Sequence, residues 1–228
     1  MLEKVFQKLK LVNNITDKVV LSHPITTITS DANDMFVNIN LSDIEPFEEI
    51  GIYELNKTLN LVGLFENYEL NIKDNNLEIN SPGKNGKIRL ADLEIMSDYK
   101  KDPNIIESSY KFDAVSNFEL TKENINKFKK AISILNNLDG VKFTGVDNDT
   151  KVGLAQVNRF EICSDDYEET FLGSSNKNFE ITISSENFLK LPVLDYKVKV
   201  FYNSEKDRYR IIFEAGENAE IKIAIALI

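Results

Sequence analysis

Several residue types that build enzyme and metal sites are scarce in this sequence of 228 residues. It has one cysteine (Cys163), one histidine (His23), no tryptophan and nine glycines. A single cysteine excludes an internal disulfide and a cysteine-based metal cluster, and it is typical of a reducing compartment. The glycines form no phosphate-binding loop, and there is no G-x-S-x-G motif. His23 precedes Pro24 in an expected turn, where we interpret it as structural.

The sequence also lacks a long apolar run. No stretch approaches the roughly 18 apolar residues of a membrane span. The first residues, MLEKVFQKLKLV, have neither an uninterrupted apolar core nor a small-residue cleavage site. Hydrophobic residues make up 42% of the chain and charged residues 28%, a globular composition. We therefore expect a soluble intracellular protein.

Acidic side chains offer no convincing catalytic or metal-binding group either. They occur together in expected loops and turns, as Asp165 with Asp166, Glu168 with Glu169, and Asp147 with Asp149. A D-x-D pair without the glycine and distal glutamate of a calcium loop is best interpreted as solvated turn acids. We expect no catalytic residue, no metal and no cofactor, which favours a binding or scaffold protein over an enzyme.

What the sequence does contain is an amphipathic helix, expected over residues 120–136. Thr121 is placed as the N-cap, and Glu123 puts an acid in the first turn. One face is apolar because four residues recur at three- and four-residue spacing: Ile125, Phe128, Ile132 and Leu135. The opposite face is basic, with Lys122, Lys127 and Lys130, and with Lys129 at its flank.

Three other segments repeat this combination of an apolar face and lysines. Residues 2–15 predict a helix with Lys4, Lys8 and Lys10 away from the apolar side. Residues 52–63 predict a second helix, with Lys57 opposite its apolar face and Gly63 as the C-cap. Residues 185–191 predict a short helix with Ser185 as the N-cap, Lys190 near its end and Pro192 after it.

Short β-rich runs separated by turn residues fill the remainder of the chain. The expected strands cover residues 18–21, 25–29, 35–39, 68–72, 77–79, 87–90, 114–120, 141–144, 152–157, 160–163, 179–183, 198–202, 209–213 and 219–226. Each half of the chain is thus a helix, a group of strands, a second helix and three more strands. The pattern predicts an α+β fold with two duplicated domains, although one continuous α+β domain remains the alternative.

The boundary between the two halves is expected in a polar segment that contains Pro103 and shows neither helical nor strand periodicity. We place an N-terminal domain at 1–97, an interdomain linker at 98–112 and a C-terminal domain at 113–228.

The formal net charge of the chain is -10, which argues against a protein that coats nucleic acid through its bulk charge. Basic helix faces in such a protein indicate a surface reserved for a large anion, although a solvated lysine face is the simpler interpretation of any one helix. If the helices lie on one face of the sheets, one DNA-facing surface is formed by Lys4, Lys8, Lys10, Lys57, Lys122, Lys127, Lys130 and Lys190. Aromatic residues do not alternate with these lysines, which disfavours a module for single strands.

Three stretches carry a resemblance to a known family. Residues 37–64, VNINLSDIEPFEEIGIYELNKTLNLVGL, and residues 85–92, NGKIRLAD, resemble the DNA polymerase sliding clamp of T4-like bacteriophages. Residues 112–125, FDAVSNFELTKENI, are similar to that family's entrance to its second domain. The resemblance extends over nearly the whole chain in length and order, with N-I-x-L-S-D and I-Y-E-L-N as its most specific parts. It is lost in the acid-rich segment 164–178 and at the C-terminal end.

The resemblance implies two clamp-type domains per chain, each with antiparallel sheets and two helices on one face. Three chains would close a homotrimeric ring around duplex DNA and tether the replicative polymerase. The implied partners are duplex DNA, the polymerase, a clamp loader and two further copies of the chain, in the cytoplasm of an infected bacterium. Ring closure would pair edge strands near residues 87–95 and 160–163 of neighbouring copies.

Partners are expected to dock through short apolar peptides in a groove near the linker. Ile105, Ile106 and Tyr110 are apolar residues in this otherwise polar segment, which makes them candidates for the groove. They would equally serve to hold the linker against the core.

Two other classes of protein remain as alternatives. One is a monomeric enzyme or small-ligand-binding α+β protein whose site is formed by scattered acidic residues. The other is a structural β-protein that assembles through its sheet edges without contacting DNA.

Overall fold

The computed structural model describes residues 2–135, 139–155 and 167–228. The chain forms two compact units, Met1–Pro103 and Asn104–Ile228. The strand expected at 160–163, the end of the one expected at 152–157, Cys163 and the pair Asp165 and Asp166 lie outside the described residues.

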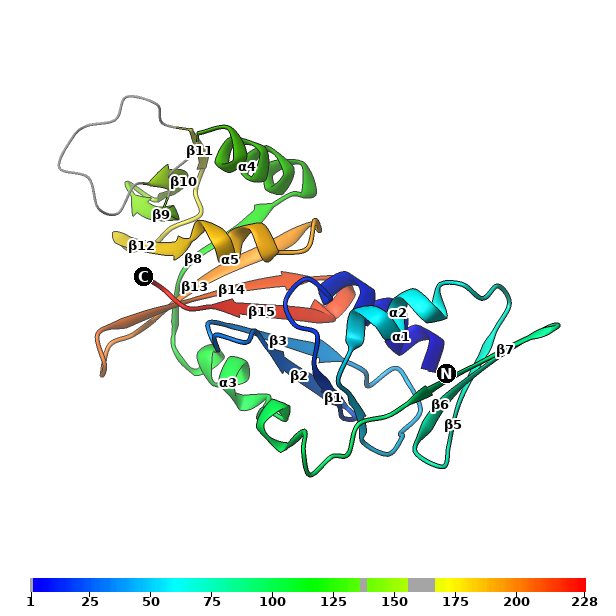
Figure 1. Cartoon of the computed structure of the whole chain (residues 1–228). Helices are drawn as coiled ribbons and strands as arrows, with labels where there is room; N and C mark the ends of the chain where they lie inside the picture. Colours follow the sequence, from blue (N-terminus) through cyan, green and yellow to red (C-terminus); the bar gives the residue numbers. More distant parts are fainter. Residues whose placement is uncertain (1, 136–138, 156–166) are drawn as a thin grey trace. The chain divides into compact units, whose positions relative to one another are not determined.

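The first unit contains two helices and seven strands (Figure 1). In chain order they are α1 (Leu2–Val12), β1 (Val19–Leu21), β2 (Ile25–Thr29), β3 (Met35–Asn40), β4 (Ile50–Ile52), α2 (Leu55–Val62), β5 (Glu69–Lys73), β6 (Asn76–Ser81) and β7 (Lys84–Arg89). All strand pairings within this unit are antiparallel. Strand β1 pairs with β4, β2 pairs with β3, and β6 lies between β5 and β7 and pairs with both. The short helix η1 (Ser97–Tyr99) follows them.

Helix α1 forms because its apolar residues fall on one side at helical spacing. Leu2, Val5, Phe6, Leu9 and Val12 are all buried. Helix α2 buries Leu55, Leu59 and Val62 in the same way, and it ends at Gly63 as expected. The ends of α1 and α2 are tied together, since the Asn13 side-chain amide donates to Asn56 Oδ1 over 2.9 Å.

The second unit repeats this order after two short helical turns. It contains α3 (Asn104–Glu107), η2 (Ser108–Lys111), β8 (Asp113–Leu120), α4 (Lys122–Leu135), β9 (Gly140–Val146), β10 (Asp149–Ala155), β11 (Glu168–Phe171), β12 (Phe179–Ser184), α5 (Ser185–Lys190), β13 (Tyr196–Asn203), β14 (Arg208–Ala215), η3 (Glu217–Ala219) and β15 (Ile221–Ile225). One antiparallel sheet has the order β11-β10-β9-β12, and in another β15, β14, β13 and β8 are successive neighbours.

Aromatic side chains join the two helices of this unit to each other and its two sheets to each other. Phe128 of α4 and Phe188 of α5 are fully buried, with ring centroids 5.9 Å apart. Phe143 of β9 and Phe213 of β14 meet at 6.2 Å. In Figure 1, α4 and α5 lie side by side, and the two helices contact each other.

Helix α4 begins with the cap expected from the sequence. Thr121 Oγ1 accepts a hydrogen bond from the Asn124 backbone N–H, and Asn124 Oδ1 accepts one from the Thr121 N–H in return. This reciprocal pair satisfies first-turn donors that the helix itself leaves open. The helix expected at 185–191 begins at Ser185 as α5, but its expected N-cap was wrong, because Ser184 and not Ser185 accepts from the Asn187 N–H.

Two further expectations were wrong in detail. Ile52 does not begin α2. It pairs with Val19 in strand β4, and the helix starts after Glu54, where Asp17 accepts hydrogen bonds from the first two helical N–H groups. Glu168 and Glu169 lie in strand β11 and not in a loop, since β11 pairs with β10.

The segment expected as the linker contains most of η1 and all of α3 and η2, each too short to show a helical period.

Candidate nucleic-acid interface

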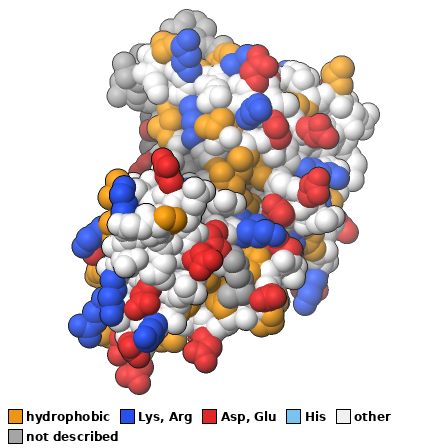
Figure 2. All heavy atoms as spheres, turned by 90° about the vertical axis from the view of Figure 1, so that its right-hand side faces the viewer, with side chains coloured by type: hydrophobic (Ala, Val, Ile, Leu, Met, Phe, Trp, Pro, Cys, Tyr) orange, Lys and Arg blue, Asp and Glu red, His pale blue; other side chains and the backbone are white. Residues whose placement is uncertain are grey.

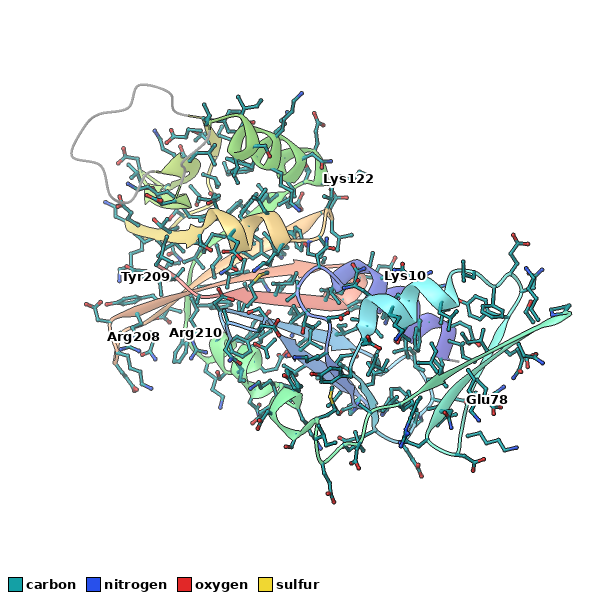
Figure 3. The ribbon with its side chains drawn as sticks, viewed as in Figure 1. Lys10, Glu78, Lys122, Arg208, Tyr209 and Arg210 are labelled. Atoms are coloured by element: carbon teal, nitrogen blue, oxygen red, sulfur yellow. The ribbon has the colours of Figure 1, made fainter. Side chains whose placement is uncertain are left out.

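Each unit presents two helices whose apolar sides are buried and whose outer sides carry lysines. Lys10 lies near the end of α1, and Lys122 lies in the first turn of α4 (Figure 3). Lys4 and Lys130 are exposed one or two turns from them. Among the residues that the structure describes, none of these four lysines has an ion-pair partner.

Three of the other expected DNA-facing lysines are paired with an acid on the same helix. Lys57 Nζ lies 2.7 Å from Glu54, Lys127 Nζ 3.3 Å from Glu123, and Lys190 Nζ 2.8 Å from Glu186. The first acid stands at the N-cap position of its helix and the other two lie in the first turn. We call these the helix-acid pairs.

Lys8 differs from its neighbours on α1. Its Nζ donates to the Asn40 carbonyl oxygen over 2.9 Å and lies 3.0 Å from Asp43, and its side chain is only 13% exposed. The hydrogen bond from Lys8 holds the pKa of Asp43 below its ordinary value. Lys8 therefore ties α1 to the segment after β3 and contributes little free positive charge.

Lys129 occupies the flank of α4, as expected, but it faces α5. Its Nζ donates to the backbone carbonyls of Leu189 and Leu191. Half-burial lowers the pKa of this ammonium group. Its bonding is structural, because it satisfies carbonyls at the C-terminal end of α5.

The helices nevertheless concentrate positive charge. Formal charges are +2 on α1, +1 on α2, +3 on α4 and 0 on α5, so these four helices carry +6 while the rest of the chain carries -16. The positive charge is not continuous, however. On the face drawn in Figure 2, lysine and arginine side chains alternate with aspartate and glutamate.

The candidates for the partner-peptide groove have different environments. Ile105 is 36% exposed, whereas Ile106 is fully buried and so holds α3 against the core. The Tyr110 hydroxyl donates to Glu214, and burial raises the pKa of this phenol well above its ordinary value. Its ring lies beneath two ammonium groups, those of Lys222 at 4.6 Å and Lys199 at 5.2 Å. Of the three, Ile105 is the side chain with the most surface to offer a peptide.

A cavity of about 280 Å³ lies in the first unit beside the beginning of the segment expected as the linker. Its lining includes Ile25 and Pro24 together with Glu49, Lys100 and Pro103. Glu49 lies 2.7 Å from Lys100 Nζ, so these two charges are already paired with each other. His23, at the same cavity, has its Nε2 3.0 Å from the Ile44 carbonyl oxygen, a structural contact.

Within the described residues, no group of three or more His, Cys, Asp or Glu side chains is placed to hold a metal ion. Asp149 accepts a hydrogen bond from the Gly173 N–H, and Glu169 accepts one from the Tyr167 hydroxyl. These acids therefore take part in local contacts. No helix in the described part of the chain has the length and apolar character needed to cross a membrane.

Comparison with solved structures identifies the fold. Proliferating cellular nuclear antigen from Entamoeba histolytica superposes with a TM-score of 0.71 at 14% identity, over 98% of this chain and 94% of that one. The chain has the sliding-clamp fold. The DNA polymerase sliding clamp from Pseudomonas aeruginosa superposes with a TM-score of 0.63 at 12% identity, over 99% of this chain and 62% of that one. For the Helicobacter pylori beta clamp bound to a DNA ligase peptide the TM-score is 0.60 at 13% identity, over 99% and 64%.

The clamp fold confirms the expected α+β class with antiparallel sheets and paired helices. The chain spans less than two thirds of the length of these two bacterial clamps. No protein-family model matches the sequence, and no curated protein does either.

Sequence reasoning missed two features of this surface. The helix-acid pairs have a sequence signal, because an acid three or four residues before a lysine on a helix predicts such a pair. The contacts of Lys8 and Lys129 have no such signal, since their partners lie 32 to 62 residues away in sequence.

Proposed function

We propose that this chain is a sliding clamp, a non-enzymatic processivity factor that encircles duplex DNA and tethers a DNA polymerase. The observation that carries the proposal is the clamp fold over 98% of the chain, matched to 94% of a proliferating cellular nuclear antigen. The helices of each unit carry a net positive charge, +3 on α1 and α2 and +3 on α4 and α5 in a chain of -10, and so tolerate phosphate.

The DNA-facing residues in this proposal are the eight lysines expected from the sequence. Lys4, Lys10, Lys122 and Lys130 act as free cations. Contacts of this kind go to the phosphate backbone, so they are nearly equal at every base step and leave the ring free to slide.

Three copies of the chain would close a ring of six units. Such a ring carries a formal charge of about -30, three times that of one chain, so its retention on DNA is topological and not a matter of affinity. A polymerase bound to the ring rebinds its template in an effectively intramolecular step, which raises processivity.

Two exposed sheet edges fit head-to-tail closure between copies. Of the described strands, β7 is the outer strand of its sheet, and it carries Lys84, Lys87 and Arg89. Strand β11 is the outer strand of the β11-β10-β9-β12 sheet, and it carries Glu168 and Glu169. Edge strands offer unpaired N–H and C=O groups, and these two edges also have opposite charge. Pairing of unlike edges generates a closed ring when the rotation between copies allows it.

The sequence led us to expect pairing between residues 87–95 and 160–163 of neighbouring copies. Residues 160–163 lie outside the described residues, so the proposal names β11 as the partner of β7. Leu172 follows β11 and is 81% exposed, an apolar side chain that a neighbouring copy would cover.

A clamp of this kind has peptide partners. The Helicobacter pylori beta clamp is bound to a DNA ligase peptide, which supports docking of short peptides on this chain. Ile105, in the linker of residues 98–112, remains our candidate contact, with a polymerase and a clamp loader as the partners. The stretches 37–64 and 85–92 support a clamp of a T4-like phage, acting in the cytoplasm of an infected bacterium.

The test is retention on DNA with and without free ends. We expect the loaded protein to remain on closed circular plasmid through gel filtration at moderate salt and to be lost after the plasmid is linearised. The triple variant Lys122→Glu, Lys127→Glu and Lys130→Glu should fold and assemble normally but fail to load or to support processive synthesis. Equal retention on circular and linear DNA would contradict topological binding.

The solution mass gives an independent test of the ring. Analytical ultracentrifugation should detect a species near 78 kDa, three times the 26.0 kDa chain. A strict monomer at all concentrations would rule out the homotrimer.

A further inference from the structure

The helix-acid pairs lie on three different helices and share one arrangement. In each, a glutamate at the beginning of the helix reaches a lysine one turn later. The carboxylate-bearing side chains are 56%, 77% and 79% exposed for Glu54, Glu123 and Glu186, so they face the same solvent as the lysines.

These acids are not needed to cap their helices. Thr121 accepts from the Asn124 N–H in α4, Ser184 accepts from the Asn187 N–H in α5, and Asp17 accepts from the Asn56 N–H in α2. Exposed ion pairs at this spacing stabilise a helix by only about 0.3 to 0.5 kcal/mol. An acid near a helix N-terminus adds about 0.3 to 1 kcal/mol through the helix dipole, so the effect of each acid on helix stability is small.

Their electrostatic effect on a polyanion is larger. Each carboxylate offsets the positive charge of a lysine Nζ about 3 Å away. A DNA phosphate about one Debye length from such a pair is therefore attracted only weakly, because the two charges of the pair nearly cancel. Affinity for duplex DNA and its salt dependence both follow the number of cations that neutralise phosphates.

From this arrangement we infer that Glu54, Glu123 and Glu186 each limit the affinity of their own helix, α2, α4 or α5, for duplex DNA. The inference rests on the proposed function and deepens it. The four unpaired lysines, Lys4 and Lys10 in the first unit and Lys122 and Lys130 in the second, make the phosphate contacts. The acids keep further lysines of α2, α4 and α5 from adding contacts that would hold the duplex and stop the ring from sliding.

The test compares two triple variants with the same net charge. The helix-acid variant carries Glu54→Gln, Glu123→Gln and Glu186→Gln. Its control carries Glu66→Gln, Glu205→Gln and Glu217→Gln, which are exposed residues outside α1, α2, α4 and α5. Affinity for a fluorescent 30-base-pair duplex is measured by anisotropy from low to moderate salt.

We expect the helix-acid variant to bind the duplex roughly tenfold more tightly than the native chain at 0.1 M salt, with a steeper salt dependence, by up to about 0.9 in log–log slope per added contact. In single-molecule tracking on stretched DNA, the helix-acid variant should diffuse along the duplex more slowly than the native chain. The control should change affinity much less. If both variants bind alike, overall charge explains the effect and the inference is wrong.

The plasmid experiment separates this result from the proposed function. Retention of the native chain on circular DNA, together with unchanged duplex affinity in the helix-acid variant, would overturn the inference and leave the clamp intact. Absence of retention, together with tighter binding by the helix-acid variant, would overturn the clamp and leave the role of the acids on this surface standing.

Discussion

Lys129 on α4 donates a hydrogen bond from its Nζ to the Leu189 carbonyl oxygen on α5, 2.8 Å away. The same group donates to Leu191, so one lysine connects two helices that both face outward with other lysines. Its position in the sequence, between Phe128 and Lys130, does not distinguish it from a DNA-facing lysine.

We therefore expect Lys129→Met to destabilise the fold. The change removes the donor of two backbone carbonyls, of which the one of Leu189 is exposed to water, so we expect a loss of about 1 kcal/mol in the free energy of unfolding. Urea unfolding would measure it. Lys130→Met is the matched control, because Lys130 is exposed and has no described ion pair, and its effect should stay within about 0.5 kcal/mol. Equal destabilisation by the two variants would contradict the structural role of Lys129.

Lys8 and Lys10 form a second matched pair, this time for DNA binding. Lys10→Gln removes a free cation and should weaken duplex binding and reduce its salt dependence. Lys8→Gln removes a charge that already lies 3.0 Å from Asp43, and should lower thermal stability more than Lys10→Gln does. Anisotropy and thermal unfolding of both variants test this. If Lys8→Gln weakens duplex binding more than Lys10→Gln does, Lys8 must leave Asp43 and contact DNA in the complex.

Charge reversal tests closure of the ring at β7 and β11. Lys87→Glu places an acid on the β7 edge opposite the acids of β11, so we expect the trimer to dissociate at least about tenfold more readily, a change of about 1.4 kcal/mol. Glu168→Lys combined with Lys87→Glu should restore part of the assembly. Sedimentation over a range of concentrations is the measurement, and an unchanged trimer in the single variant would place the interface elsewhere.

Stability at acid pH should depend on Glu49. The hydrogen bond from Lys100 holds the pKa of this carboxyl below its ordinary value of 4.5. A carboxyl with a depressed folded pKa stabilises the protein above its unfolded pKa, and this contribution is lost as pH falls through the folded pKa. Thermal unfolding temperature should therefore decrease as pH falls below about 4.5, and it should decrease less in Glu49→Gln. Parallel curves for the two proteins would exclude Glu49 as the source.

The helix packing of the second unit depends on Phe128. Its ring is fully buried and lies 5.9 Å from that of Phe188 and 5.0 Å from that of Tyr167. Phe128→Ala should lower the free energy of unfolding by about 3 to 5 kcal/mol. Denaturant unfolding checks this, and a loss below 1 kcal/mol would mean that the neighbouring rings close the cavity.

Much of the fold could be predicted because periodicity is local. The apolar residues of α1 and α4 recur at helical spacing, and Thr121 has the side chain of an N-cap, so the sequence alone predicts these helices and their basic faces. Strand β4 could not be separated from α2 by pattern, because Ile52 and Leu55 also fit one helical face. What assigns Ile52 to a strand is its pairing with Val19, a contact across 33 residues.

The candidate site was predictable to the same extent. Sequence places the lysines on the helices, but pairing decides which of them are free. Lys8 and Lys129 have the spacing of DNA-facing residues and bond instead to Asn40 and Leu189, which only the tertiary structure brings near. The roles of Ile105 and Tyr110 in a peptide groove stay predictions.

If the chain closes the proposed ring, the division of charge between +6 on four helices and -16 elsewhere has a consequence for a cell that holds many unloaded copies. Duplex DNA that approaches such a ring from outside would meet repulsion, so idle copies would not accumulate along the chromosome or compete with proteins that coat it. Occupancy of DNA is then determined by how often a ring is opened and threaded. A many-fold rise in the abundance of the protein would then not slow other proteins that move along the DNA.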